Sequence, residues 1–433
     1  MPSRRRFLQS LAGSLALPFL SSRSNSQPAT SLQPDDFPKA EDPRFWEKIR
    51  KQFYLREDEA FFNTGTMGAS PKPVIDAVAN NMRELAATMA EWDYKPDHPN
   101  WFTGYYSEKP LREKLAKLIN CDFDEVSLTQ NATMGMNIIA HGLDLRHGDE
   151  VIQTDQEHPG GKSGYEVRVK RDGIVWKSIK IPIPANDPDE IVTMIKNAIT
   201  PRTKVIAWPH IVSLFGTVMP VEKICALARE HNIFTVLDGA QTVGHIKVDV
   251  RDLGCDAYFS SPHKWLLAPA GNGLLYVRRE VAPKIWTVLA SSAWDDQTDV
   301  GLRLQQRGTG NLSLLVGLEA AIDFFNRVGA DRWIGRIKQL GDYLRSGLQK
   351  MEGVKIHSST HPEMCAGITT WGVTGMHGDK MQDYFWEKGR LRPRSMGELY
   401  GVRQSTCIYN NEKEIDRTLA LAKEMVGMVA KKG

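Results

Sequence analysis

The chain has few cysteines, and their distribution excludes several classes of protein. Five occur among 433 residues, at Cys121, Cys225, Cys255, Cys365 and Cys407. Their number is odd, they are widely scattered, and no pair has the close spacing of a zinc site. The sequence therefore predicts neither a disulfide framework nor a metal centre.

An excess of charge of one sign is also lacking beyond the N-terminus. The formal net charge is +3, but four arginines and no acid lie within the first 23 residues, which leaves 51 basic and 52 acidic residues beyond them. Because no basic stripe is present, nucleic acid is not an expected partner. A hydrophobic share of 41% with 25% charged residues is typical of globular domains and allows a large domain plus a smaller one.

The N-terminal segment has no apolar run long enough to cross a bilayer, since Leu11–Leu20 is too short. This run follows Ser3-Arg-Arg-Arg-Phe-Leu-Gln9, which resembles a twin-arginine export signal with Gln9 where lysine is common. We therefore expect residues 1–31 to be a twin-arginine signal peptide and linker, and the twin-arginine export machinery to be a partner. The protein is expected to be periplasmic or otherwise exported; a disordered basic tail is the alternative.

The most informative segment is Ser261-Pro-His-Lys264, which follows a strand-like run at 256–260 and precedes a glycine-rich stretch. A lysine placed between hydroxyl and imidazole donors and tight glycine turns is suited to form an imine with pyridoxal phosphate. A surface lysine at a strand end is the alternative, and it is the commoner case for a lysine taken alone. The segments upstream favour the cofactor.

Two upstream segments supply partners that this cofactor requires. Asp238 ends the strand-like run 233–237, where open α/β sheets bind ligands, and its carboxylate can hold a pyridine nitrogen protonated. A helix N-cap is the alternative role for Asp238. Gln241 can donate to the phenolic oxygen of the ring. His158 follows another strand-then-turn pattern and can stack on the ring and transfer protons.

A third segment has the features of a phosphate site. Residues 130–137 follow a strand-like run and begin an expected helix, and backbone N–H groups at a helix N-terminus bind phosphate. Ala132 and Thr133 are the expected donors, joined by Ser261 and His263 beside the lysine.

The order of these motifs resembles the class V branch of fold-type I pyridoxal enzymes over about residues 58–425. That branch includes cysteine desulfurases, serine–pyruvate type aminotransferases, kynureninases and isopenicillin N epimerase. The motifs that carry the resemblance are Asn131-Ala-Thr133, His158, Asp238-x-x-Gln241 and Ser261-x-His263-Lys264. The resemblance implies an enzyme that acts at the α-carbon of an amino-acid substrate through a Lys264 aldimine, with His158 and Asp238 as further catalytic residues.

Three more site residues follow from this resemblance. Arg403, in Arg-Gln-Ser-Thr-Cys-Ile-Tyr-Asn410, is similar to the arginine that binds the substrate α-carboxylate, which its planar fork suits. Arg392 and Arg394 remain alternatives for this role. Asn63 lies in a turn that reaches the substrate pocket in relatives. Thr309 lies in a Gly-Thr segment like the one that a neighbouring subunit lends to the cofactor phosphate, so a homodimer is expected.

The order of expected elements predicts an α/β fold in two parts. Strands alternate with helices between about residues 65 and 310, which favours a mainly parallel sheet covered on both faces. The resemblance implies the fold-type I arrangement, with a seven-stranded sheet in a large domain at 60–310. Residues 32–59 and 311–433 are expected to form a smaller α+β domain.

One departure from the family narrows the chemistry. Residues 390–402, before the carboxylate-binding arginine, contain no cysteine, so a desulfurase with a thiol nucleophile is disfavoured. A class V aminotransferase or an isopenicillin N epimerase-like enzyme is the leading expectation. A C–S lyase acting on a cysteine conjugate and a non-catalytic pyridoxal-binding protein are the alternatives.

Overall fold

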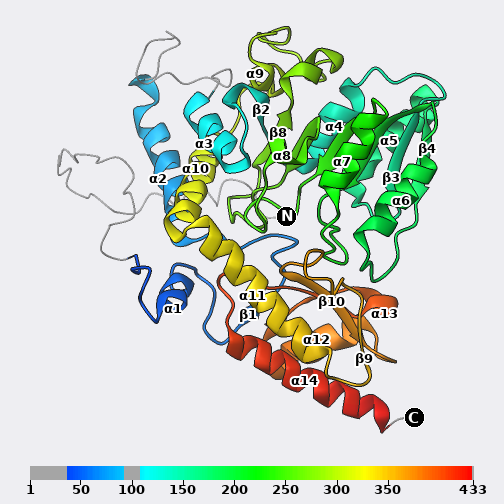
Figure 1. The fold of residues 1–433 in the computed structure, drawn as a ribbon. Helices are drawn as coiled ribbons and strands as arrows, with labels where there is room; N and C mark the ends of the chain where they lie inside the picture. The colour runs from blue at the N-terminus through cyan, green and yellow to red at the C-terminus, as the bar shows by residue number, and fades with distance from the viewer. Residues whose placement is uncertain (1–36, 92–107, 432–433) are drawn as a thin grey trace, which may run out of the picture.

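The structure, a computed structural model, describes residues 37–91 and 108–431 (Figure 1). The expected export signal therefore lies outside the described residues. Within them, two sheets occupy different ends of the molecule, and the long helix α11 (Ala330–Leu348) runs from the middle of the molecule along the end that holds the smaller sheet. None of the helices in these two ranges combines the length and apolar character that a bilayer crossing requires.

The large sheet has seven strands in the order β2-β8-β7-β6-β5-β3-β4. Six run in the same direction, and β8 alone is antiparallel to its neighbours. This arrangement confirms the predicted fold class. The strands are β2 (Val126–Thr129), β3 (Glu150–Thr154), β4 (Val175–Ile179), β5 (Thr203–Pro209), β6 (Phe234–Asp238), β7 (Ala257–Ser260) and β8 (Gly273–Val277).

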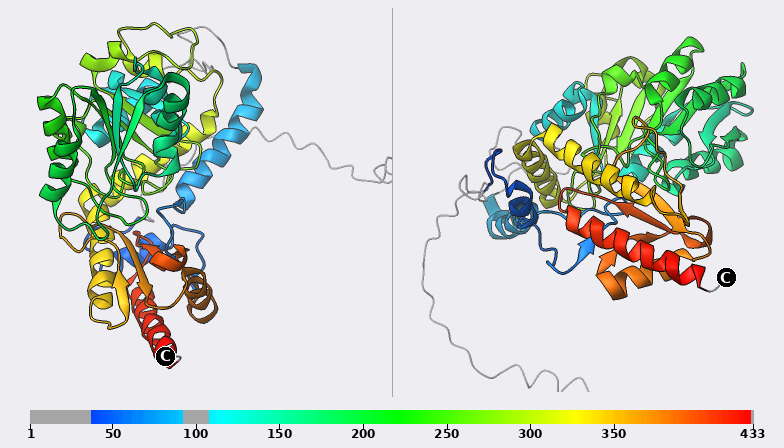
Figure 2. Two further views of the ribbon diagram at one scale, coloured as in Figure 1. Left: turned by 90° about the vertical axis from the view of Figure 1, so that its right-hand side faces the viewer. Right: turned by 60° about the horizontal axis from the view of Figure 1, so that its bottom comes forward.

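Both faces of this sheet are buried. Successive residues of the central strands point to opposite sides, and each side has its own cluster of buried apolar residues. Val151 and Val205 belong to a core cluster on the side of α4 and α5, whereas their neighbours Ile152 and Ile206 belong to the cluster on the other side. Figure 2 shows helices on both faces of the sheet. The covering helices are α3 (Lys109–Ile119), α4 (Ala132–Gly142), α5 (Pro159–Asp172), α6 (Pro188–Ala198), α7 (Val221–Glu230), α8 (Val250–Leu253) and α10 (Leu312–Val328).

Side-chain caps fix where the helices after β2 and β3 begin. The side chain of Asn131 accepts a hydrogen bond from Met134 N at the start of α4, at 2.9 Å. His158 Nδ1 accepts one from Gly160 N at the start of α5, at 3.0 Å. Since a cap satisfies an otherwise unpaired N–H group of the first turn, both helices start right after their strands.

The smaller sheet has four strands in the order β12-β13-β10-β9 and packs against helices from the C-terminal part of the chain. A separate parallel pair joins β1 to β11, which ties the segment before the large sheet to this smaller half. The elements here are β1 (Ala60–Phe61), β9 (Val354–Ile356), β10 (Ile368–Val373), β11 (Leu391–Arg392), β12 (Arg394–Ser395), β13 (Val402–Ser405), α12 (Gly378–Gly389), α13 (Gly397–Tyr400) and α14 (Glu412–Ala430). The exact domain boundaries remain predictions.

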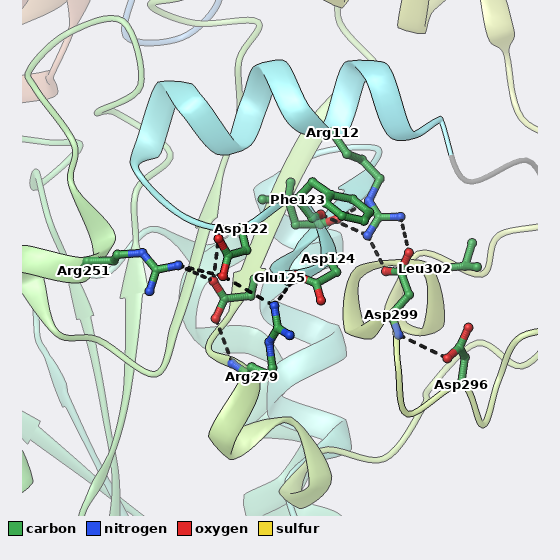
Figure 3. A network of polar contacts seen from close by, with 11 residues as sticks. Arg112, Asp122, Phe123, Asp124, Glu125, Arg251, Arg279, Asp296, Asp299 and Leu302 are labelled. Carbon is green, nitrogen blue, oxygen red and sulfur yellow. Dashed lines mark hydrogen bonds and ion pairs between the residues drawn. The ribbon is translucent and has the colours of Figure 1, made fainter.

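A network of charged side chains fastens α9 (Val300–Leu304) to the edge of the large sheet (Figure 3). The fully buried Arg112 on α3 donates from Nη1 to Asp299 Oδ2 at 2.9 Å and from Nε to Val126 O at 2.7 Å. Asp299 also caps α9 by accepting from Leu302 N at 2.8 Å. The network therefore holds the chain just before Thr309 in place.

The remaining helical segments precede or flank this edge. They are α1 (Phe45–Arg50), α2 (Lys72–Thr88) and the 3₁₀ helices η2 (Met89–Glu91), η3 (Phe123–Glu125) and η4 (Arg279–Lys284).

Candidate active site

The carboxyl ends of the parallel strands surround a cavity of about 260 Å³, where open α/β sheets bind their ligands. Seven of the predicted site residues line it: Ala132, Thr133, His158, Asp238, Ser261, His263 and Lys264. The first and last of them, Ala132 and Lys264, are 132 residues apart along the chain. They meet here because each lies at or just after the end of β2, β3, β6 or β7. The remaining lining residues are Gly65, Thr66, Asn131, Gly160, Ser213, Ala240 and Arg394.

Lys264 is half-buried at the wall of this cavity, and its charge is opposed by its surroundings. The pKa of its ammonium group is lowered to about 8, because burial and the nearby Arg403 and Arg394 outweigh the opposite effect of Asp238. A lysine in this condition has a substantial neutral fraction near neutral pH, so its amine can act as a nucleophile or a base. The sequence predicted this role.

Asp238 ends β6 and faces the same cavity. Its Oδ1 accepts a hydrogen bond from Ala240 N at 2.8 Å. Burial raises the pKa of this carboxyl, while Ala240 N and Lys264 oppose the increase. A Cβ on Gly161 would lie 2.8 Å from Asp238 Oδ2, so only glycine there lets α5 approach the carboxylate this closely.

The segment around Ser261 forms a cradle with the start of α4. Ser261 Oγ accepts a hydrogen bond from Ala132 N at 3.0 Å, and Thr133 and His263 line the cavity beside them. His263 Nδ1 is buried and has no hydrogen-bond partner among the described residues. Burial, with Lys264 nearby, lowers the pKa of this imidazole to about 4. Hydroxyl, imidazole and backbone donors at one helix N-terminus match a phosphate group.

His158 lies exposed at the mouth of the cavity, where its ring is fixed by the cap of α5. Partial burial lowers the pKa of the imidazole, and Lys264, Arg394 and Arg403 lower it further. Because Nδ1 accepts from Gly160 N, the neutral ring carries its proton on Nε2.

Arg403 is fully buried beside the cavity, and its recorded hydrogen-bond acceptors are all neutral. Its Nη1 donates to Ser213 O at 2.7 Å, and Nη2 donates to Asn63 Oδ1 at 3.0 Å and to Thr66 Oγ1 at 2.9 Å. Its Nε is buried without a partner among the described residues. Burial lowers the pKa of this guanidinium to about 9, with Arg394 adding to the effect. A buried cation in this state favours binding of an anion.

Arg394 is the neighbour of Arg403 across the β12–β13 pair, and it lines the cavity directly. Arg403 itself lies behind Thr66 and Ser213, which line the cavity in front of it. The third arginine that the sequence offered, Arg392, is stacked over the ring of Trp386 at 4.2 Å and does not line the cavity. The structure thus brings two of the three candidate arginines together.

Gln241 and Thr309 lie away from the cavity of their own chain. Gln241 Nε2 donates to Gly65 O at 2.7 Å and to Ser213 Oγ at 3.2 Å, and its Oε1 accepts from Trp265 Nε1 at 2.8 Å. Its amide is therefore engaged with protein groups and supports the cavity wall through Ser213. The predicted contact between Gln241 and the cofactor ring stays a prediction. Thr309 is exposed, so its predicted contribution to a neighbouring site stays a prediction.

Two residues of the site were not singled out from the sequence. Ser213 follows β5 and contacts both Gln241 and Arg403. Glu157 is buried directly before His158 and lies close to Asp238. Their positions after parallel strands were the available signal, because such positions converge at one edge of the sheet.

None of the five cysteines lines the cavity, and all five belong to the described residues. Burial raises the pKa of the Cys225 and Cys407 thiols to about 12. Neither thiol is a reactive thiolate at neutral pH.

Within residues 37–91 and 108–431, no cluster of three or more metal-ligating side chains occurs.

A family model described as aminotransferase class-V matches residues 61–418. The isopenicillin N epimerase of Amycolatopsis lactamdurans is 28% identical over 399 residues, which is 88% of this chain and 98% of the relative. A probable cysteine desulfurase of Xylella fastidiosa is 26% identical over 425 residues, covering 92% of this chain and 97% of the relative.

Solved structures of C-DES have the same fold. A lysine-to-alanine mutant of C-DES, with glycine covalently linked to the PLP cofactor, matches with a TM-score of 0.76 and 26% identity over 86% of this chain and 98% of its own. The complex of this cystine C–S lyase with cysteine persulfide matches with a TM-score of 0.72 and 25% identity over 84% and 98%.

Proposed function

The chain belongs to the aminotransferase class V family, and from this premise we propose that it moves the α-proton of an amino acid as an aminotransferase or an isopenicillin N epimerase-like enzyme. It is a pyridoxal phosphate enzyme that acts at the α-carbon of its substrate, as its relatives are. The choice among reactions of this family is the part that we propose.

The cavity residues fit pyridoxal phosphate. Lys264 would hold the cofactor aldehyde, Asp238 its ring nitrogen and His158 its ring face, while Ala132 N, Thr133, Ser261 and His263 would hold the phosphate. The unpartnered Nδ1 of His263 and the glycines that open space around Asp238 and Thr133 support this fit. When bound, the cofactor supplies an electron sink for the electrons left at the substrate α-carbon.

The chain's own groups then position the substrate and move one proton. Arg403, assisted by Arg394, binds the substrate carboxylate, which fixes the bond at the α-carbon that can break. The amine of Lys264 accepts the α-proton and can return it, because its lowered pKa leaves it neutral and basic at working pH. The observation that carries the proposal is a buried arginine whose hydrogen-bond acceptors among the described residues are all neutral, beside a lysine with a pKa of about 8.

A C–S lyase acting on a cysteine conjugate is the second candidate. It is favoured by the likeness to the cystine C–S lyase C-DES and by a cavity that no cysteine of this chain lines. Such a lyase releases sulfur without passing it to a protein thiol. A non-catalytic carrier is disfavoured, because a carrier has no use for the carboxylate site at Arg403.

Product analysis separates these candidates. We expect either a keto acid that forms only with an amino acceptor, or an inverted amino acid without net consumption. A thiol and a keto acid from one substrate would instead establish the lyase.

Arg403→Gln should raise KM for the amino acid on the order of 100-fold and Arg394→Gln about tenfold, since each removes a charge-assisted contact. The stacked Arg392→Gln is the matched control, and an unchanged KM in Arg403→Gln would contradict the assignment.

We also propose that the protein is exported in folded form through the twin-arginine pathway. The motif at Ser3–Gln9 supports this, and a route for folded proteins would allow the cofactor to be loaded before export. Replacing both Arg4 and Arg5 by lysine should leave the protein in the cytoplasm, as fractionation would show. Unchanged export of this variant would refute the proposal.

A further inference from the structure

A second carboxyl group lies directly behind Asp238. Glu157 follows β3, is buried, and immediately precedes His158. A Cβ on Gly161 would lie 2.8 Å from Asp238 Oδ2 and 3.4 Å from Glu157 Oε2, so both carboxyl groups reach the same point on α5. The other oxygen, Glu157 Oε1, accepts hydrogen bonds from Thr154 N at 3.2 Å and Thr154 Oγ1 at 3.1 Å.

Glu157 and Asp238 line one narrow internal space whose walls contain no cation. The residues around it are Gln153, Glu157, Gly161, Tyr165, Ala207, Trp208, Val236, Asp238 and Phe259. Gln153 Oε1, Tyr165 Oη and Trp208 Nε1 are buried there without hydrogen-bond partners among the described residues. Polar groups thus collect around the two acids in a part of the core that is otherwise apolar.

The charged groups around Glu157 do not neutralise both Glu157 and Asp238, so the two carboxyl groups share one proton. Among the described residues, the charges that act most on Glu157 are the acid Asp238 on β6, which raises its pKa, and Lys162 on α5, which lowers it. The ammonium of Lys162 lies 3.1 Å from Glu166 and is partly exposed, which weakens its effect on Glu157. Tyr165 on α5 is neutral, because burial raises its pKa, and Trp208 on β5 and Phe259 on β7 carry no charge.

Asp238 is the acid that keeps its negative charge. It faces Lys264 and the place of the cofactor ring nitrogen, whereas Glu157 faces only protein. Burial, with Asp238 nearby, raises the pKa of Glu157 well above its ordinary value. The proton belongs on Oε2, because Oε1 already accepts two hydrogen bonds and Oε2 faces Asp238.

We propose that Glu157 is a positioning residue, a neutral carboxylic acid that directs its Oε2 hydroxyl toward Asp238 and keeps that carboxylate ionised and oriented toward the cofactor. The proposal rests on the pyridoxal phosphate function above, since it acts only through Asp238. It assigns a role to a buried acid that takes no part in the proton transfer itself.

The test compares Glu157→Gln, Glu157→Ala and, as a control, Glu166→Gln as holoenzymes; Glu166 is a partly exposed acid on α5. The dissociation constant of pyridoxal phosphate and the pH dependence of its absorption band are measured for each. An amide keeps the shape, neutrality and donor of a protonated acid. We therefore expect Glu157→Gln to bind within about twofold of wild type with the same pH profile, and Glu157→Ala to bind about tenfold more weakly, the scale of one lost hydrogen bond to a charged group. Glu166→Gln should match wild type.

A cofactor analogue with carbon in place of the ring nitrogen distinguishes positioning from mere packing. Wild type and Glu157→Ala should bind this analogue with similar affinity, because the effect of Glu157 passes through Asp238 to that nitrogen. A deficit that persists with the analogue would overturn the proposal. The proposal would also be overturned if Glu157→Gln bound pyridoxal phosphate as weakly as Glu157→Ala does. The same holds if Glu157→Gln bound it far better than wild type at high pH, because that gain would mean that Glu157 is charged in wild type.

These outcomes are distinguishable from failure of the proposed function. If wild type itself does not bind pyridoxal phosphate, the function fails before Glu157 is tested. If wild type binds and only the pattern among the variants differs, the inference about Glu157 fails alone. Should Glu157→Ala not fold, the Gln variant and its pH profile still decide the matter.

Discussion

At the scale of single residues, the surroundings of Lys264 disfavour the charged form of its side chain. The lysine is held between a cavity wall and two arginines, and a Cβ on Gly68 would lie 2.1 Å from its carbonyl oxygen. The chain therefore needs glycine at 68 to bring the turn after β1 against the lysine. Burial of this lysine lowers the free energy of unfolding and leaves the amine reactive, a combination that is common at functional sites.

Replacement of this lysine tests the linkage between its pKa and stability. In the unfolded chain the pKa of lysine is about 10.4, and in the fold it is about 8. The unfolded state therefore binds more protons between these pH values, and wild-type stability rises with pH across that window. The cofactor-free Lys264→Met variant should be more stable than wild type by roughly 2 kcal/mol at pH 7, and this advantage should shrink toward pH 10.

Urea unfolding of both cofactor-free proteins at pH 7 and pH 10 measures this difference. The exposed Lys350→Met variant is the control and should show no such dependence on pH. An advantage of Lys264→Met that is equal at both pH values would mean that packing, and not the charge, is the cause.

The sequence was sufficient to predict the location of those site residues whose position depends on the backbone alone. Ala132, His158, Asp238 and Lys264 follow strands, so the parallel sheet brings them to one edge whatever their rotamers. The surroundings of Gln241 were not predictable in the same way. They depend on which way a buried side chain turns, and in the structure its Nε2 donates to Gly65 O while its Oε1 accepts from Trp265 Nε1.

At the scale of elements, long periodic segments were predictable and short ones less so. The helices α10 (Leu312–Val328) and α11 (Ala330–Leu348) are long enough for their hydrophobic periodicity to be visible in the sequence. A two-residue strand such as β12, which places Arg394 beside Arg403, has no periodicity that the sequence could reveal.

The attachment of α9 to α3 depends on one buried ion pair. Asp299 pairs with the fully buried Arg112 and caps α9 (Figure 3). Asp299→Ala should destabilise the protein by about 3–5 kcal/mol, because it removes a charged partner of the buried Arg112 guanidinium and the N-cap of α9. The exposed Asp323→Ala, which loses an ion pair to Lys114, should cost less than about 1 kcal/mol.

Urea unfolding of the two variants at neutral pH compares these losses. The double variant Arg112→Met/Asp299→Leu should recover part of the stability, since both charges are then removed. Equal losses in Asp299→Ala and Asp323→Ala would show that the network contributes no more than a surface pair.

At the scale of the whole molecule, the site is proposed to be complete only in a dimer. Thr309 is exposed and lies outside the cavity of its own chain, although α9 holds the chain before it firmly in place. Sedimentation should give a species of twice the chain mass, and Thr309→Val should weaken pyridoxal phosphate binding severalfold without changing that mass. A monomer with full cofactor affinity would refute this proposal.

Whether Lys264 carries the cofactor of an amino-acid enzyme can be read from an absorption spectrum. The spectrum of the purified protein is recorded before and after addition of amino acids, for wild type and Lys264→Ala. We expect wild type to show a band of covalently held pyridoxal phosphate that changes when a substrate amino acid is added, and we expect Lys264→Ala to lack this band. A wild-type protein without the band after incubation with pyridoxal phosphate, or the same band in Lys264→Ala, would show that Lys264 does not carry the cofactor.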